Sequence, residues 1–219
     1  MKLYYDPMST TSRPVTLFLL DQGLPVELEV VELFAEQHHT PEYARINSNQ
    51  IVPFLVDGDF GLGESSAMLK YLAEKTSSPT YPTELKARAR VNEAMDWFNT
   101  QVHRDLCLYF VYPQVLPPGH VPEVDLEFGR NGTRRWLTVL DRHMLAGRPY
   151  VCGDQITLAD YLGVAHVTVA ELIDFDFSPW PNVARWIARM KARPGWAAAN
   201  AGFNGWIASR AQTITEPAE

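Results

Sequence analysis

The spacing of hydrophobic positions divides the chain into two parts. Up to about residue 77, short apolar runs alternate with short amphipathic segments, whereas from residue 84 onward the apolar positions recur at helical spacing over long stretches. A turn-rich segment with two prolines, Thr76–Thr83, separates the two patterns, and all six tryptophans lie after residue 96. We therefore expect two domains, residues 1–77 and 84–210, and a frayed tail from Thr213 to Glu219.

The first part predicts a small α/β domain. Its pattern indicates elements in the order β-α-β-α-β-β-α, at Lys2–Tyr5, Ser12–Gly23, Val26–Val31, Pro41–Ile46, Pro53–Val56, Phe60–Leu62 and Ser65–Glu74. The tripeptide Asp57-Gly58-Asp59 is typical of a tight hairpin between the fifth and sixth elements. A compact sheet covered by helices, of roughly 80 residues, is the arrangement that this order favours.

The second part predicts helices throughout. Helical periodicity runs over Leu85 to about Tyr109, Glu123–Leu145, Leu158–Ile173 and Val183–Ala192. The third stretch is apolar nearly all round, which is typical of a helix buried at the centre of a bundle. Its start, Thr157 to Asp160, has the spacing of a capping box, so we assign that motif to structure and not to chemistry.

Composition narrows the range of partners. The 46% of hydrophobic residues is enough for a folded core, and 19 basic against 26 acidic residues give a net charge of −7. A net-acidic domain is poorly suited to nucleic acid or to anionic membranes, so neither is an expected partner. Two cysteines and no Cys-x-x-Cys pair, with no signal-peptide pattern at the start, indicate a cytoplasmic protein that handles a small soluble molecule.

Three segments of the first domain carry candidate chemistry. Hydroxyl residues Ser9–Ser12 lie between the first strand and the first helix, where free N–H groups and the helix dipole would stabilise an anion or an ionised thiol. Taken alone, they are better explained as a helix cap, with Ser12 as the capping residue. At Val52-Pro53, a cis bond would expose the backbone of Val52 to a peptide-like ligand, while a trans proline on an edge strand is the alternative. The segment Gly63–Met68 offers a helix start for a carboxylate, with an ordinary cap as its alternative.

Together the three segments suit a ligand that has a thiol, a peptide backbone and an amino-acid head, as glutathione does. The whole chain resembles the cytosolic glutathione transferases, in particular the serine-type theta/delta-like group common in bacteria. The resemblance covers residues 1–205 and rests on Ser9-Thr10-Thr11-Ser12-Arg13, Asn47 to Pro53, Glu64-Ser65, Tyr112-Pro113-Gln114, Gly153 to Asp160, Pro181 to Trp186 and Arg193-Pro194-Gly195-Trp196. It implies a thioredoxin-like α/β domain, an all-α domain, a homodimer, and conjugation of glutathione to an electrophile with no further cofactor.

The resemblance assigns roles to individual positions. Ser9 matches the serine that activates the thiol, as a donor to the thiolate and not as a nucleophile, although Thr10, Thr11 and Ser12 stay open as alternatives. Residues that match the glutathione-binding positions are His38, Gln50, Ile51, Val52, Pro53, Glu64, Ser65 and Ser66. Ser66 stands where an arginine is common in some branches, which weakens any electrostatic clamp, and Thr10 stands where a cysteine occurs in others.

The electrophile is expected above the sulfur, against the second domain. Its candidate walls are Met8 and the aromatic stretch around Tyr109 and Tyr112, with Phe203 and Trp206 as possible lids, although core packing explains each of these residues equally well. The adjacent His38 and His39 should point apart and lack a third ligand at suitable spacing, so no metal site is expected. The other histidines form no evident constellation.

Two other functions remain open at this point. The same thiolate could remove halide from small haloalkanes, which release of halide would reveal. The fold could also serve a non-catalytic ligand-binding or scaffold protein, since a fold does not determine a function. Retention of the residues for the glutathione head argues against the scaffold.

Overall fold

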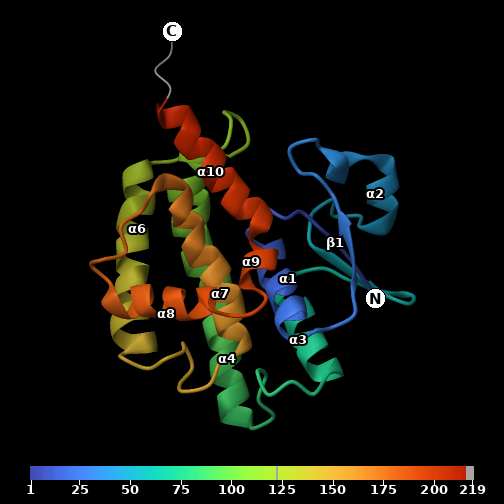
Figure 1. Ribbon diagram of the computed structural model, residues 1–219, viewed down its shortest axis with the longest axis horizontal. Helices are drawn as coiled ribbons and strands as arrows, with labels where there is room; N and C mark the ends of the chain where they lie inside the picture. Colours follow the sequence, from blue (N-terminus) through green and yellow to red (C-terminus); the bar gives the residue numbers. More distant parts are fainter. Residues whose placement is uncertain (122, 216–219) are drawn as a thin grey trace.

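The computed structural model describes residues 1–121 and 123–215, with side chains described as far as Arg210. A small sheet with its helices forms one side of the molecule, and a bundle of longer helices forms the other (Figure 1). The last sheet-domain helix ends at Lys75 and the first bundle helix begins at Leu85, on either side of the turn-rich segment. This is the predicted combination of a thioredoxin-like domain and an all-helical domain.

The sheet has four strands in the order β2-β1-β3-β4. Strand β1 (Lys2–Tyr5) is parallel to β2 (Glu27–Val30) and antiparallel to β3 (Phe54–Asp57), which in turn pairs with β4 (Phe60–Leu62). The register places Leu3 opposite both Leu28 and Leu55. The predicted hairpin is confirmed, because Asp57 pairs with Phe60 and Gly58 has the positive φ of 67° that such a turn requires.

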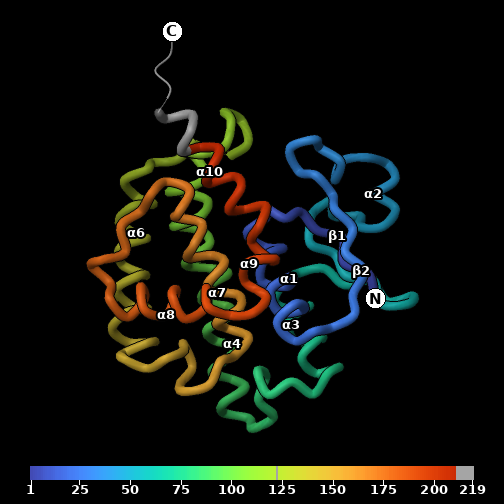
Figure 2. Tube along the Cα trace, viewed as in Figure 1, coloured from blue at the N-terminus to red at the C-terminus, as the bar shows by residue number. Residues whose placement is uncertain are grey.

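Helices cover both faces of the sheet. Helices α1 (Ser12–Asp21) and α3 (Ser65–Lys75) lie between the sheet and the bundle (Figure 1). The short α2 (Pro41–Ile46), preceded by the single turn η1 (Gln37–His39), covers the opposite side (Figure 2). There Tyr43 packs with Val31 and Val52 in a small core of its own.

The bundle is built around one long helix and one buried helix. The long helix runs without a break through α4 (Leu85–Trp97), η2 (Phe98–Val111, with wider π-type turns) and α5 (Tyr112–Val115), and it packs along α6 (Leu126–Val139) and η3 (Leu140–Leu145). Every residue of α7 (Leu158–Thr168) is buried, as predicted for the central helix, and η4 (Val169–Ile173) continues it. The remaining helices are α8 (Pro181–Lys191), α9 (Trp196–Ala199) and α10 (Ala201–Thr215).

Several elements in this domain differ from the prediction, and the first helix, expected to end near Tyr109, continues to Val115. The second helix begins at Leu126 and not at Glu123, because the Asp125 side chain accepts the N–H of Glu127 and caps the helix there. Helix α9 was missed because it is only four residues long, and α10 was missed because Gly202 and Gly205 weaken its helical signal, a weakness that burial of Phe203 outweighs. Residues Thr213–Thr215, expected in the frayed tail, belong to α10, while 216–219 lie outside the described residues.

The start of α7 confirms the capping prediction. The Thr157 N–H donates to Asp160 Oδ2 over 2.8 Å, and the Val151 N–H and the Trp186 indole N–H both donate to Oδ1, over 2.9 Å each. One buried carboxylate therefore satisfies donors from three segments of the bundle. The Asp160 side chain orders the entry to the central helix, as a structural motif should.

A buried arginine joins the two domains. Arg13 of α1 is 1% exposed, and its guanidinium donates to Asn200 Oδ1 (2.7 Å) and to Thr168 Oγ1 (2.6 Å) and stacks on the Phe203 ring at 3.7 Å. Burial lowers the pKa of Arg13 to about 10, so the side chain stays charged at neutral pH. A second junction forms where the Tyr161 O–H donates to Asp21 over 2.6 Å.

Gly163 provides a test of packing in the central helix. A Cβ atom at this position would lie 2.3 Å from the ring of Phe98, which is fully buried and cannot move aside. We expect Gly163→Ala to lower the free energy of unfolding by about 1–3 kcal/mol, measured in urea. Gly205→Ala is the matched control, because no atom lies within 4 Å of its added Cβ; it should be neutral or stabilising by up to about 1 kcal/mol. Equal stability of the two variants would contradict this account.

The buried imidazole of His166 should make the protein less stable in mild acid. Burial lowers the pKa of His166 in the folded chain to about 3, whereas an unfolded histidine titrates near pH ~6.5. Between these values the unfolded chain binds the extra proton, so stability is complete above pH ~6.5 and falls as the pH falls toward 3. Between pH 7.5 and pH 5, the free energy of unfolding should fall by about 1–2 kcal/mol. Urea titrations should show a smaller pH dependence for His166→Leu and an unchanged one for the exposed His143→Gln.

Candidate functional site

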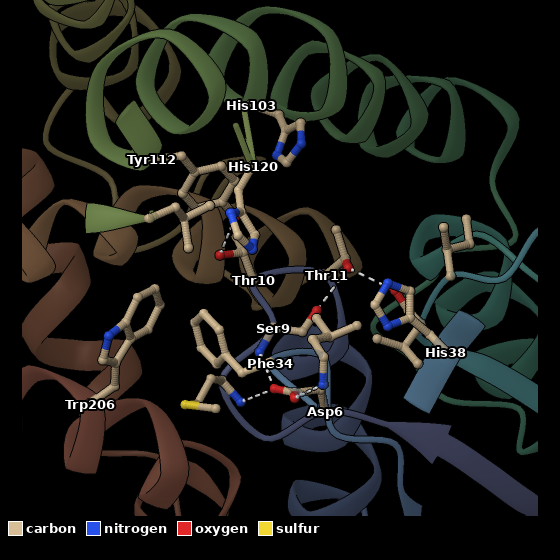
Figure 3. Close-up of a pocket in the computed structure, with 15 residues that line it drawn as sticks. Asp6, Ser9, Thr10, Thr11, Phe34, His38, His103, Tyr112, His120 and Trp206 are labelled. Carbon is tan, nitrogen blue, oxygen red and sulfur yellow. Dashed lines mark hydrogen bonds between the residues drawn. The ribbon is translucent and has the colours of Figure 1, made fainter. Parts of the chain in front are cut away.

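A cavity of ≈ 370 Å³ lies between the two domains, at the carboxyl end of β1 (Figure 3). The sheet domain and the bundle both contribute to its walls. The lining residues are Asp6, Met8, Ser9, Thr10, Thr11, Leu33, Phe34, His38, Ile51 and Val52 from the first domain and His103, Tyr112, Leu116, His120 and Trp206 from the second.

The buried carboxylate of Asp6 holds the loops that form this cavity. Asp6 directly follows β1 and is 1% exposed. Its Oδ1 accepts the N–H groups of Met8 (2.7 Å) and Ser9 (3.1 Å), and its Oδ2 accepts that of Leu33 (3.0 Å). The loop after β1 is thereby tied to the loop after β2, which carries Phe34 and His38.

The Ser9 hydroxyl lies at the start of α1. Its oxygen accepts the N–H of Ser12 over 3.2 Å, one of the free donors at the helix end. The prediction that Ser12 caps the helix is therefore wrong: Ser12 is fully buried and its own hydroxyl accepts the N–H of Asp6 (3.3 Å). Ser9 therefore provides the capping hydrogen bond from outside the N-cap position, and its half-buried hydroxyl lies on the cavity wall at the positive end of the helix.

The neighbouring hydroxyls already have partners inside the fold. Thr10 is 4% exposed, and its oxygen accepts the O–H of Tyr112 over 2.8 Å, a contact that crosses between the domains. Burial raises the pKa of Tyr112, so this phenol stays a donor. Thr11 donates to the carbonyl of Val52 (3.1 Å) and lies 3.0 Å from the Ser9 oxygen. Of the four hydroxyls, Ser9 is the one that both lines the cavity and accepts a free N–H at the start of α1.

The Val52–Pro53 bond is cis, and β3 lies between β1 and β4. The alternative of a trans proline on an edge strand is therefore wrong. Val52 and Ile51 line the cavity, whereas Pro53 is buried behind them and does not. Gln50, which has a positive φ of 53°, is half-buried beside the cavity but is not part of its wall.

The start of α3 lies next to the Ser9 loop. Ser65 is buried, with 7% of its surface exposed, and its hydroxyl donates to the backbone carbonyl of Thr11 over 2.7 Å. Glu64 is exposed and has a positive φ of 61°, and Ser66 is half-buried. None of these three residues lines the cavity itself. Their part in binding a γ-glutamyl head stays a prediction.

The histidines differ most from expectation. The rings of His38 and His39 do not point apart, since their centroids lie 3.8 Å from each other. His38 lines the cavity, and burial with the neighbouring His39 lowers its pKa. His103 and His120 line it as well and were missed, because no local pattern marks them and only the packing of the bundle brings them there (Figure 3). Within residues 1–121 and 123–215, no three His, Cys, Asp or Glu side chains are grouped as a metal site.

Three of the five residues predicted to contact the electrophile line the cavity, and two do not. Met8, Tyr112 and Trp206 line the cavity as expected. Phe203 is 1% exposed beneath the Arg13 guanidinium and cannot act as a lid. Tyr109 turns toward α6, with its ring 5.9 Å from that of Phe128.

An aromatic contact closes one side of the cavity mouth. The ring of Phe34, from the loop after β2, meets the indole of Trp206, from α10, edge to face at 5.7 Å (Figure 3). Phe34 was missed, although two large apolar residues in a loop, Leu33 and Phe34, were a visible signal. The contact makes the cavity a feature of both domains.

No helix in the described part of the chain has the length and apolar character needed to span a membrane.

Comparison with known proteins agrees with both halves of this arrangement. Residues 3–80 match the family described as "Glutathione S-transferase, N-terminal domain", and residues 104–194 match "Glutathione S-transferase, C-terminal domain". Human glutathione S-transferase theta-2B is 36% identical over 198 residues, 88% of this chain and 81% of that protein. Glutathione S-transferase D7 of Drosophila melanogaster is 30% identical over 200 residues, 90% of this chain and 87% of that protein.

Solved structures show the same fold. Human glutathione transferase theta-2, in complex with glutathione and an unknown ligand, has a TM-score of 0.84 at 31% identity, over 99% of this chain and 92% of that one. A delta-class transferase of Nilaparvata lugens has a TM-score of 0.84 at 31% identity, over 95% and 99% of the two chains. These relatives are animal proteins, so the bacterial subgroup stays a prediction. The two matched domains and the theta relatives show that the chain belongs to the glutathione S-transferase family.

Proposed function

We propose that this glutathione transferase uses Ser9 to hold the thiol of glutathione as a thiolate, which attacks an electrophilic, partly hydrophobic small molecule. The observation that carries the proposal is the position of the Ser9 hydroxyl, at the N-terminus of α1 and on a cavity shared by both domains. Family membership supports conjugation over the scaffold and dehalogenase alternatives.

The expected gain in thiol ionisation follows from the local donors. A free thiol has a pKa of about 8.5, which leaves only a few per cent ionised at neutral pH. A hydrogen bond to a charged partner contributes roughly 1.5–3 kcal/mol, and a helix N-terminus adds about 0.3–1 kcal/mol. After discounting for solvent, the pKa of the bound thiol should fall by roughly 1.5–3 units. Bound glutathione is then mostly thiolate at neutral pH.

The rest of glutathione is proposed to lie along the first domain, residues 1–77. Val52 lines the cavity next to Ser9 and offers its backbone to the cysteinyl part of the ligand. His38 lines the same cavity and is the candidate contact for the glycyl end, with Gln50 behind it. Glu64, Ser65 and Ser66, at the start of α3, are proposed to receive the γ-glutamyl head.

The electrophile is proposed to bind against the second domain, residues 84–210. Tyr112, Leu116 and Trp206 provide apolar surface there, and Met8 and Phe34 complete the wall from the first domain. His103 and His120 add polar groups to the same surface. This mixture suits a molecule that is hydrophobic in part and carries a polar group.

We further infer a cytoplasmic homodimer. Phe60, Leu85 and Phe128 are large apolar side chains that the single chain leaves 45%, 79% and 55% exposed. A second copy would cover such side chains, and a mass measurement of the native assembly tests this inference. The two cysteines are both free, as a reducing compartment would keep them.

Replacing Ser9 should separate binding from catalysis. We expect Ser9→Ala to bind glutathione with little change but to lose about 10- to 100-fold in turnover at pH 6.5, because the thiol returns toward its ordinary pKa. At saturating glutathione, the apparent pKa in the pH profile of kcat/KM for the electrophile should rise by about 1–2 units in the variant, since the rate rises with pH as the bound thiol ionises. Calorimetry and an electrophile assay over pH provide the measurements.

The exposed Ser48→Ala is the matched control and should behave as the parent. Because the Ser9 oxygen also caps α1, Ser9→Ala should cost about 0.5–2 kcal/mol of stability, so both variants are compared well below their melting temperatures. Unchanged turnover in Ser9→Ala would move the role to a neighbouring hydroxyl. If the parent chain bound neither glutathione nor S-hexylglutathione, the scaffold would be the better interpretation.

Trp206 should affect the electrophile more than glutathione. Its indole lies at the cavity mouth against Phe34, on the bundle side. We expect Trp206→Ala to weaken binding of S-hexylglutathione about 5- to 50-fold, since truncating an aromatic side chain that a ligand covers typically costs about 1–2 kcal/mol or more, while glutathione binding changes less than about twofold. The exposed Asn204→Ala on the same helix is the control. Equal losses for both ligands would remove Trp206 from the electrophile site.

A further inference from the structure

The hydroxyl of Thr11 connects two groups that the proposed function uses separately. It donates to the Val52 carbonyl over 3.1 Å, and its oxygen lies 3.0 Å from that of Ser9. Ser9 in turn accepts the N–H of Ser12 at 3.2 Å. A continuous hydrogen-bond chain therefore runs from the start of α1 through two hydroxyls to the backbone that precedes β3; Figure 3 shows its two hydroxyls, Ser9 and Thr11.

The Thr11 hydroxyl makes no hydrogen bond that caps α1 or joins it to α3. Thr11 occupies the N-cap position of α1, yet its side chain makes no capping hydrogen bond, because Ser9 provides that contact. The link from Thr11 to α3 uses its backbone carbonyl, which accepts the Ser65 hydroxyl, and does not involve the side chain. Thr11 also lines the cavity. Both side-chain partners of Thr11 are thus groups of the candidate site.

The number of available protons determines which group donates in each of these hydrogen bonds. A hydroxyl has one proton, and a carbonyl oxygen can only accept. The proton of Thr11 lies on its bond to Val52, so in the Ser9–Thr11 contact the proton must come from Ser9. In the ligand-free site the Ser9 proton is therefore used in the bond to Thr11 and is not free to meet a sulfur.

We propose that Thr11 is a positioning residue that couples binding of the glutathione backbone at Val52 to the orientation of the Ser9 hydroxyl. This inference rests on the proposed function. When an amide N–H of the ligand takes the Val52 carbonyl, the Thr11 O–H turns to the Ser9 oxygen, and the Ser9 O–H turns to the sulfur. No O–H bond breaks; two hydroxyls rotate, and each keeps its proton.

The reversed chain makes Ser9 a better donor. Its oxygen then accepts from both the Ser12 N–H and the Thr11 O–H, and hydrogen bonds in such a chain polarise one another. The reversal also costs little, because the bond that Thr11 loses at Val52 is replaced by one from the ligand. Thr11 thus contributes to thiol ionisation without touching the sulfur.

Thr11→Val tests this coupling, because valine keeps the shape of threonine and removes only the hydroxyl. The pKa of the bound thiol is read from the ultraviolet absorbance of the thiolate as enzyme-bound glutathione is titrated with base. We expect that pKa to rise by about 0.3–0.7 unit and turnover below it to fall about two- to fivefold, from loss of one polarising bond. Affinity for glutathione and the melting temperature should stay close to those of the parent. Thr11→Ser, which restores a hydroxyl, should restore the thiol pKa.

The outcomes separate this inference from the function on which it rests. A parent chain that binds no glutathione, or binds it without ionising the thiol, would overturn both. A parent that ionises the thiol and a Thr11→Val variant with the same or a lower thiol pKa would overturn the coupling alone. An equal rise in Thr11→Ser and Thr11→Val would also overturn it, since the effect would then come from shape and not from the hydroxyl.

Discussion

The carboxylate of Asp6 is the interaction on which the site depends. It lies buried at the end of β1 and accepts three backbone N–H groups, from Met8, Ser9 and Leu33. Each of these donors would be costly to bury without an acceptor, by about 1–3 kcal/mol. One side chain therefore determines both the path of the loop that presents Ser9 and the position of the loop that carries Phe34 and His38.

The second constraint is that neither domain makes the cavity alone. The loop that carries Ser9 is held from the sheet side by Asp6 and from the bundle side by the bond between Tyr112 and Thr10. Four residues farther on, Arg13 spans the junction and finds an amide, a hydroxyl and an aromatic face in place of a carboxylate. Its hydrogen-bond partners are all neutral, and the charge of Glu171 helps to keep the buried guanidinium protonated.

Elements with strong local signals were predicted well. The hairpin at Asp57–Asp59, the capping box at Thr157 and the apolar central helix each depend on neighbours in the chain, and all three are present. Elements that depend on distant contacts were not. The sequence around Gly202 and Gly205 favours no helix, and α10 forms there because the bundle and the buried Phe203 hold it in place.

For the site, the sequence by itself determined which chemistry was available: a hydroxyl at a helix start, a Val-Pro backbone segment and a serine at a second helix start. Only the tertiary structure decided which groups meet. It placed Ser12 in the core and Ser9 at the cap, turned Phe203 away from the cavity, and brought His103 and His120 into it. The reason is physical: a cap or a turn is selected by contacts within a few residues, whereas a cavity between two domains is defined by packing between segments about 50 or more residues apart, which no local pattern encodes.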